Sequence, residues 1–172
     1  MGKRRQPLKA QTPVVLRMMS KANLENEEET IMKRSASAVW TGDLRSGKGA
    51  ISTESGVLSE TPYSFKTRFE HGPGTNPEEL IGAAHAGCFS MALSLELQKA
   101  KLIAERIETK ADVTLEQKAG GFAITAVHLT THAKVPGATQ SNFEEATEAA
   151  KAGCPVSKLL RADITLDAKL EA

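Results

Sequence analysis

The sequence predicts an α+β fold in which antiparallel sheets surround one long, buried central helix. Short segments that alternate between apolar and polar residues flank a central apolar stretch, residues 76–101. That stretch has the composition of a helix buried on all sides. The strands are grouped and do not alternate strictly with helices, which disfavours a doubly wound sheet. We therefore expect the helices to lie on one face of the sheet.

Composition limits the function classes. The 172 residues are 40% hydrophobic and 25% charged, which is ordinary for a single globular domain. The net charge of +1, from 22 basic and 21 acidic residues, indicates neither nucleic-acid nor membrane binding. No apolar run approaches the roughly 18 to 20 residues of a transmembrane helix, and no secretory signal is recognisable. We expect a soluble, cytoplasmic protein.

The first 32 residues differ from the rest. Basic residues precede the first acid, Glu25, and apolar periodicity is weak. This pattern predicts an N-terminal extension that is disordered or that comes from a start upstream of the true one. A single domain is predicted for residues 33–172.

Extended segments come next. Alternation over 35–41 and 50–55, with Gly-rich turn residues between them, predicts hairpin strands. The clearest alternation covers 63–69, where aromatic residues take one face and Arg68 takes the other. Arg68 is therefore expected on the polar side of a strand.

The central helix has a clear beginning. Asn76 precedes a proline, so it favours an N-cap, with Pro77 as the first helical residue and Glu79 closing the capping pattern. The helix is expected to run toward Lys101 and to break over 100–104. One thiol, that of Cys88, lies in its middle.

The last third of the chain combines strands and helices. Alternation predicts strands over 107–115 and 122–135, joined by a Gly-Gly turn, and a closing strand over 164–170. Between them, Ser141 and Glu144 form a predicted capping box for a helix that ends at Gly153. Pro155 suits the start of a further short helix through residue 160.

Two cysteines are too few for a disulfide scaffold and lack zinc-ligand spacing. Cys154 stands where an N-cap would, and free amides there favour a thiolate, although a turn with an inward-packed thiol is the alternative. Cys88 has no helix end near it. Burial would raise its pKa, so a reactive Cys88 needs a cation from elsewhere in the fold.

From about Ser35 to Leu170 the chain resembles the OsmC/Ohr family, the osmotically inducible and organic hydroperoxide resistance proteins, and is closest to its OsmC branch. The motifs that carry the resemblance are TESGVL (53–58), TRFE (67–70), the run 74–94, KAGCPVS (151–157) and ITLD (164–167). They cover nearly all of the chain after residue 34, in order. The extension before residue 33 has no counterpart in the family pattern.

The resemblance implies a thiol-dependent peroxidase for organic hydroperoxides and hydrogen peroxide, an interwound homodimer with active sites at the subunit interface. It implies a peroxidatic Cys88, a resolving Cys154, an active-site Glu78 and the arginine Arg68, with Arg45 the less favoured arginine. It also implies recycling by a dithiol, of lipoyl type, with no metal or cofactor. The alternative is a redox-sensing or small-molecule-binding module that uses the same fold without turnover.

Helix geometry limits how these residues meet. Cys88 and Glu78 are ten residues apart, about 15 Å along an ideal helix and roughly 80° around it. If Cys88 and Glu78 serve one site, an arginine must bridge them, the helix must depart from ideal geometry, or the two must come from different chains of the dimer. We hypothesise that the Glu78 carboxylate holds Arg68 with its guanidinium over the Cys88 sulfur, where the cation favours the thiolate.

Apolar side chains around these residues suit an alkyl hydroperoxide or plain core: Leu80, Ile81, Phe89 and Met91, with Phe65 and Phe69. His85 lies one helical turn before Cys88, and we expect a structural role for it in preference to a base. His128 and His132 are expected to be solvated strand residues, because further metal ligands are not identifiable.

Overall fold

The computed structural model describes residues 31–171. From Ser35 onward the chain forms one compact unit, two residues after the predicted start of the domain at residue 33. The prediction made for residues 1–32 lies outside the described residues, apart from the last two.

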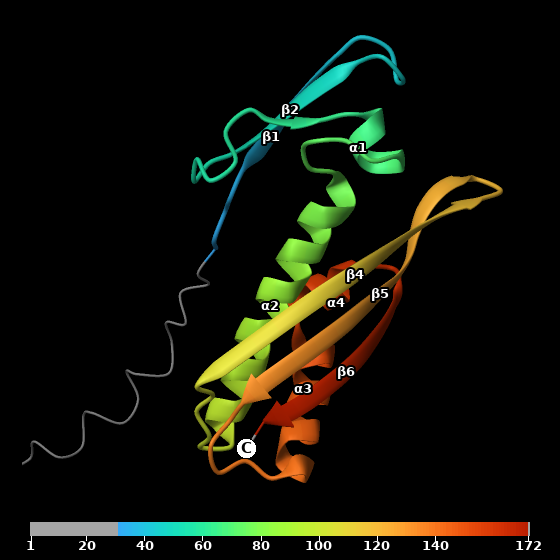
Figure 1. Cartoon of the computed structure of the whole chain (residues 1–172). Coiled ribbons are helices and arrows are strands. Elements are labelled where there is room, and N and C mark those ends of the chain that lie inside the picture. The colour runs from blue at the N-terminus through green and yellow to red at the C-terminus, as the bar shows by residue number, and fades with distance from the viewer. Residues whose placement is uncertain (1–30, 172) are drawn as a thin grey trace, which may run out of the picture. The chain divides into compact units, whose positions relative to one another are not determined.

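The compact unit contains two three-stranded sheets and four helices (Figure 1). The elements, in chain order, are β1 (Ala36–Thr41), β2 (Lys48–Thr53), β3 (Thr61–Tyr63), α1 (Phe65–Phe69), α2 (Pro77–Lys99), β4 (Arg106–Lys118), β5 (Gly121–Lys134), α3 (Gln140–Gly153), α4 (Pro155–Leu159) and β6 (Asp163–Glu171). One sheet has the order β1-β2-β3 and the other β4-β5-β6. The α+β prediction is confirmed.

The larger sheet departs from the prediction at its last strand. β4 and β5 form the predicted antiparallel hairpin, but β6 pairs with β5 in parallel. The reason is the connection: α3 and α4 lie between β5 and β6 in the chain, and such a helical crossover returns the chain in the same direction. The sheet is therefore mixed.

One face of this sheet is buried by helices, as expected. In β5 every second residue from Val127 to Ala133 is buried, and β4 and β6 show the same alternation. α2 packs on β4 and on α3. Together they enclose a core whose largest apolar members are Phe89, Leu93, Leu97, Val127, Leu129, Val135 and Phe143.

α2 begins and ends where the sequence indicates. The Asn76 side chain accepts a hydrogen bond from the Glu79 amide at 2.9 Å, and Pro77 is the first helical residue. The Glu79 carboxylate does not complete the capping box; it accepts from the Thr75 hydroxyl at 3.1 Å instead. The helix ends at Lys99, at the predicted break.

The prediction that α2 is buried all round is wrong for the single chain. Its core face is buried, but Met91 is 77% exposed and Leu95 52% exposed. The same outward face carries small residues: Ala83, Ala84, Gly87 and Ser94.

The expectation of no membrane-length apolar segment also needs correction, because α2 is long and apolar enough to span a bilayer by length and composition. Its buried face identifies it as the core helix of this unit.

The predicted strand over 63–69 is also wrong. β3 ends at Tyr63, and residues 65–69 form the short helix α1. A capping box decides this locally: the Ser64 hydroxyl accepts from the Thr67 amide at 3.3 Å, and the Thr67 hydroxyl accepts from the Ser64 amide at 2.9 Å. These hydrogen bonds outweigh the two-residue alternation. Arg68 therefore projects from a helix.

The α3 cap lies two residues earlier than predicted. Thr139 is the N-cap and forms a capping box with Asn142, in place of the predicted Ser141 and Glu144. The helix ends at Gly153, as expected. Cys154 is both the C-cap of α3 and the N-cap of α4, which starts at Pro155.

Candidate functional site

Two thiols lie next to each other where α2 meets the α3–α4 turn. Cys88 projects from the middle of α2 and is partly buried, whereas Cys154 is fully buried. They are 66 residues apart in the sequence, yet each shifts the pKa of the other through a side-chain hydrogen bond. Both are free thiols. The structure thus brings the two predicted cysteines together.

Their surroundings shift the two pKa values in opposite directions. Burial raises the pKa of Cys88, the Val156 amide works against this, and the neighbouring Cys154 adds to it. Burial also opposes the Cys154 thiolate, but hydrogen bonds from Ser157, Cys88 and the Val156 amide outweigh it and lower the pKa of Cys154. These directions favour Cys154 as the more readily ionised thiol, and no cation of the described residues lowers the pKa of Cys88.

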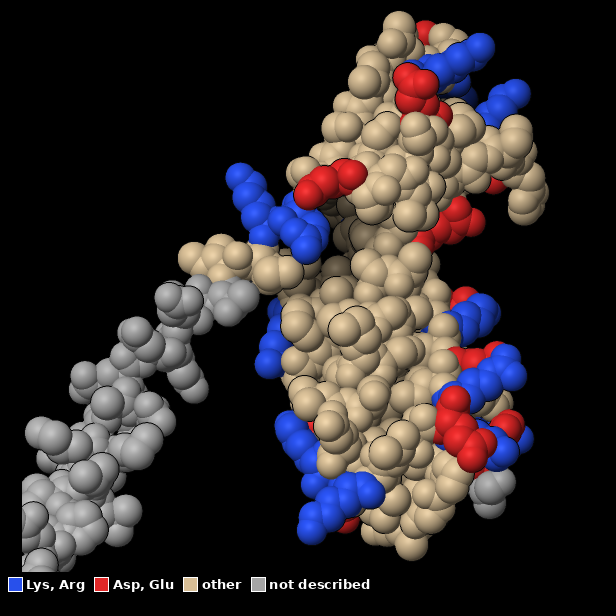
Figure 2. All heavy atoms as spheres, turned by 90° about the vertical axis from the view of Figure 1, so that its left-hand side faces the viewer, with Lys and Arg blue, Asp and Glu red and all other residues tan. Residues whose placement is uncertain are grey.

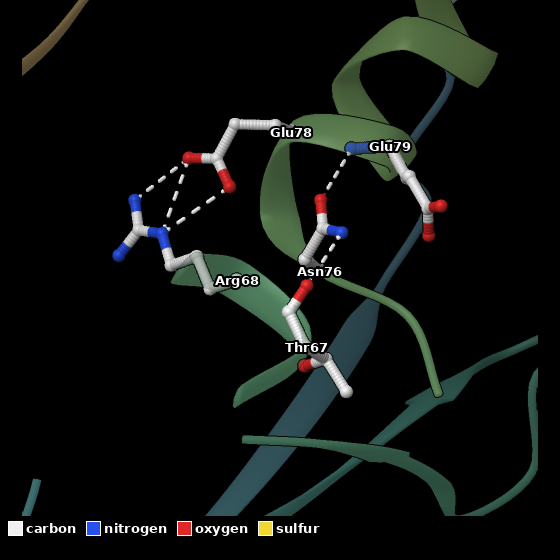
Figure 3. A network of polar contacts seen from close by, with 5 residues as sticks. All are labelled: Thr67, Arg68, Asn76, Glu78 and Glu79. Atoms are coloured by element: carbon white, nitrogen blue, oxygen red, sulfur yellow. Dashed lines mark hydrogen bonds and ion pairs between the residues drawn. The ribbon is translucent and has the colours of Figure 1, made fainter. Parts of the chain in front are cut away.

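Arg68 and Glu78 form a second pair, between α1 and the first turn of α2 (Figure 3). Arg68 Nη2 lies 2.8 Å from Glu78 Oε1, and Arg68 Nε lies 3.2 Å from each carboxylate oxygen. The Asn76 side-chain amide also donates to the Thr67 carbonyl at 3.0 Å, which ties α1 to the α2 cap. The hypothesised grip of the carboxylate on the arginine is present, and it fixes the guanidinium in place.

An apolar pocket of about 320 Å³ adjoins this pair. It is lined by Trp40, Leu44, Tyr63, Ser64, Phe65, Arg68, Phe69 and Pro77. Phe65 and Phe69, which were expected among the apolar surroundings of the reactive thiol, line this separate pocket, whereas Leu80 and Ile81 do not. Phe89 instead belongs to the core, and Met91 lies on the exposed face of α2. The alternative arginine, Arg45, lies over the Phe65 ring, 5.4 Å from its centroid.

Sequence reasoning missed the contributions of Trp40 and Tyr63 to this pocket. Their rings pack with centroids 5.4 Å apart, although the residues come from β1 and the end of β3. They are the single Trp and the single Tyr of the chain. The rarity of these two residue types, and the place of Trp40 near the end of a hairpin strand, are the features of the sequence that could have indicated the pocket.

The two pairs do not meet within one chain. Ten residues of α2, about 15 Å of helix, separate Glu78 from Cys88, and Arg68 makes no contribution to the pKa of Cys88. The helix is continuous from Pro77 to Lys99, so distortion does not bring them closer. One chain therefore carries a thiol pair and a separate arginine–carboxylate pair beside an apolar pocket.

The histidines occupy unlike places. His85 is fully buried and its Nε2 lies 2.8 Å from Ser157 Oγ. His128 contacts the Thr165 hydroxyl at 2.7 Å and the Asp167 carboxylate at 3.5 Å on the outer face of the larger sheet, and His132 is exposed there. Within residues 31–171, no group of three His, Cys, Asp or Glu side chains is arranged to hold a metal ion.

Known proteins are similar to this chain in sequence. A family model described as OsmC-like protein matches residues 70–169. The chain is 55% identical over 143 residues to Peroxiredoxin OsmC of Escherichia coli strain K12. This alignment covers 83% of this chain and 99% of that protein. It is 33% identical to the organic hydroperoxide resistance protein OhrB of Bacillus subtilis strain 168, over 72% of this chain and 88% of that protein.

A solved structure of a related protein has a similar fold. The crystal structure of an organic hydroperoxide resistance protein from Elizabethkingia anophelis matches with a TM-score of 0.65 at 28% identity, covering 83% of this chain and 99% of that one. The family model covers more than half of the chain, and the identity to the E. coli protein extends over nearly all of that protein. The resemblance found in the motifs is confirmed, and the chain belongs to the OsmC-like protein family.

Proposed function

We propose that this protein is a cysteine-based peroxidase that reduces organic hydroperoxides and hydrogen peroxide through Cys88, with Cys154 as the resolving cysteine. The observation that carries the proposal is the contact between these two thiols, which come from separate parts of the chain. Its relatives support the same activity, since they are named as a peroxiredoxin and as organic hydroperoxide resistance proteins.

The reaction uses the ordinary chemistry of sulfur. The Cys88 thiolate attacks one peroxide oxygen, the O–O bond breaks, and protonation of the leaving oxygen gives an alcohol, or water from hydrogen peroxide. The Cys88 sulfenic acid then condenses with Cys154 to a disulfide and releases water. An external dithiol of lipoyl type reduces the disulfide by thiol–disulfide exchange. This cycle uses no metal or cofactor, and reduced thiols fit a cytoplasmic location.

The proposed active unit is a homodimer. Within residues 31–171, the thiol pair has no cation among the influences on its pKa values, and the arginine–carboxylate pair lies apart from both thiols. Figure 2 shows the side of the unit that lies to the left in Figure 1; in the lower part of this view charged side chains lie at the margins and the centre is broad and uncharged. The exposed face of α2 carries Met91 and Leu95. Burying this face against a second copy would bring Arg68 of the partner subunit to Cys88 and favour its thiolate.

The proposed substrate is an organic hydroperoxide with an apolar substituent. The pocket beside Arg68 offers the rings of Trp40, Tyr63, Phe65 and Phe69 to an alkyl or aryl group. The polar peroxide end would face Arg68. Aromatic walls contribute chiefly by excluding water from the substituent, so affinity is expected to increase with its apolar area.

The activity test uses the wild-type protein with cumene hydroperoxide and dihydrolipoamide. We expect many equivalents of peroxide to be consumed per chain, with loss of peroxide measured directly. Consumption of a single equivalent, followed by a stable Cys88–Cys154 disulfide that dihydrolipoamide does not reduce, would contradict the enzyme and support the redox-sensing alternative. No consumption and no disulfide would contradict both.

The dimer is tested by placing a charge on the exposed face of α2. Met91→Lys should convert a dimer, twice 18.4 kDa, to single chains and reduce peroxide consumption with it, because an unpaired charge is costly to bury in an apolar interface. Mass is measured by light scattering. Ile103→Lys is the matched control, since Ile103 is 82% exposed but lies outside α2. A wild-type protein that is fully active as single chains would contradict the shared site.

A further inference from the structure

A buried polar chain runs from α2 to the Cys154 turn, and the reaction described above does not use it. His85 is fully buried, and its Nε2 lies 2.8 Å from Ser157 Oγ, although 72 residues separate the two. Ser157 lies three residues after Cys154, in the first turn of α4, and its backbone amide and hydroxyl both lower the pKa of Cys154. His85 and Ser157 thus form a hydrogen-bonded pair that adjoins the resolving thiol.

The backbone holds Ser157 in this position. The Cys154 amide donates to the Ala150 carbonyl at 2.9 Å, and the Lys158 amide donates to the Cys154 carbonyl at 3.1 Å. Ser157 is therefore fixed in the first turn of α4, on the same side as the Cys154 side chain. A serine held in this way can serve Cys154 only if its hydroxyl proton points to the sulfur.

The environment of His85 decides where that proton points. Its Nδ1 is buried and has no hydrogen-bond partner among the described residues. A buried N–H without an acceptor is rarer in proteins than an acceptor without a donor, so Nδ1 is assigned the lone pair and Nε2 the proton. Nε2–H then donates to Ser157 Oγ, and the single hydroxyl proton of Ser157 is left for Cys154.

We propose that His85 is a positioning residue for the resolving step, which fixes the Ser157 hydroxyl as a hydrogen-bond donor to the Cys154 thiolate. The inference rests on the proposed function and extends it to a residue that touches neither peroxide nor Cys88. A histidine that was expected to be structural acquires a positioning role. It stays neutral throughout, which agrees with the lowering of its pKa by burial.

The assisted step balances without an additional reagent. The Cys154 thiolate attacks the sulfur of the Cys88 sulfenic acid, the S–S bond forms, and the S–O bond breaks. Hydroxide leaves and takes up the proton that Cys154 lost on ionisation, which gives water. Cys88 is reduced and Cys154 oxidised in the same event, so the peroxide consumed earlier supplies all of the oxidising power.

Other groups near Cys154 do not replace the effect of His85 and Ser157 on the Cys154 thiolate. Cys88 and the neutral His85 are the groups of α2 described above beside this turn, and no charged side chain of the described residues is among the main influences on the pKa of either thiol. Lys151 of α3 is paired with Glu148 at 2.7 Å. Burial at Cys154 is therefore offset by Ser157, through its amide and its hydroxyl, together with Cys88 and the Val156 amide.

The test separates the two chemical steps. The protein, previously reduced, is mixed with one equivalent of cumene hydroperoxide, and quenched samples are examined by mass spectrometry for the sulfenic acid and then the disulfide. We expect Ser157→Ala and His85→Met to form the sulfenic acid at the wild-type rate but the disulfide about tenfold more slowly, the value of one hydrogen bond to a charged group. His85→Gln, whose amide can replace the Nε2–H donor, should restore most of the rate.

A pH profile distinguishes positioning from packing. Disulfide formation should rise with pH as Cys154 ionises, and in Ser157→Ala the profile should move about one pH unit higher. His128→Met is the matched control, because His128 also bonds a hydroxyl, that of Thr165, but is not among the influences on the pKa of either thiol. If both Ser157→Ala and His85→Met formed the disulfide at the wild-type rate and with the wild-type pH profile, the role of His85 would be overturned, while the proposed peroxidase function would stand. Absence of any Cys88 sulfenic acid in the wild type would overturn it together with the proposed function.

Discussion

Replacing Cys88 with serine is expected to reduce peroxide consumption to the uncatalysed level. A serine hydroxyl does not ionise near neutral pH, so the attacking anion is lost, and Cys154 is too deeply buried to take its place. The measurement is the loss of cumene hydroperoxide with dihydrolipoamide as reductant. The comparison variant is Cys154→Ser, which should still consume one equivalent of peroxide and stop at the Cys88 sulfenic acid.

The opposite assignment of the two thiols is the alternative that this experiment tests. In a single chain the pKa of Cys154 is lowered and that of Cys88 is raised, which by itself favours Cys154 as the nucleophile. The proposed assignment depends on accessibility, since Cys88 is the less buried thiol, and on a cation from the partner subunit. Full first-turnover consumption in Cys88→Ser, combined with its loss in Cys154→Ser, would reverse the two roles.

Removing the cation is the second large effect. Arg68→Met should slow oxidation of Cys88 by roughly 100-fold, the usual cost of deleting one fixed electrostatic stabiliser. Burial raises the pKa of Cys88, and Arg68 is proposed to lower it again. Without the arginine the pKa remains high, so the pH at which Cys88 reacts should increase. Sulfenic acid formation, followed across pH by stopped-flow mixing with one equivalent of peroxide, measures both changes.

Three further variants define the role of Arg68. Arg68→Lys should recover only part of the rate, because an ammonium group cannot reproduce the two-point contact with Glu78. Arg106→Met is the control, since Arg106 pairs with Glu108 on an exposed strand face. Arg45→Met tests the arginine that lies over Phe65. A strong loss in Arg45→Met with wild-type behaviour in Arg68→Met would assign the cation to Arg45.

Local interactions made much of the fold predictable. The α2 N-cap at Asn76 and the end of the helix at Lys99 depend on contacts within four residues, which a sequence displays directly. The β4–β5 hairpin was predicted from alternation for the same reason. Where two local signals competed, at residues 63–69, the capping box between Ser64 and Thr67 prevailed over the alternation. The parallel β6 was missed because its direction depends on how two helices pack, not on its own residues.

The candidate site, like the fold, was predictable in part from the sequence and in part only from the tertiary structure. The sequence by itself predicted which residues carry chemistry, Cys88, Cys154, Arg68 and Glu78, and that a reactive thiol in the middle of α2 requires a cation. Only the tertiary structure decided which of them meet: the two thiols on one side, Arg68 with Glu78 and an aromatic pocket on the other, and His85 behind Ser157. Contacts of this kind join residues far apart in the chain, and they form only when the helices and sheets pack, because no local pattern specifies them.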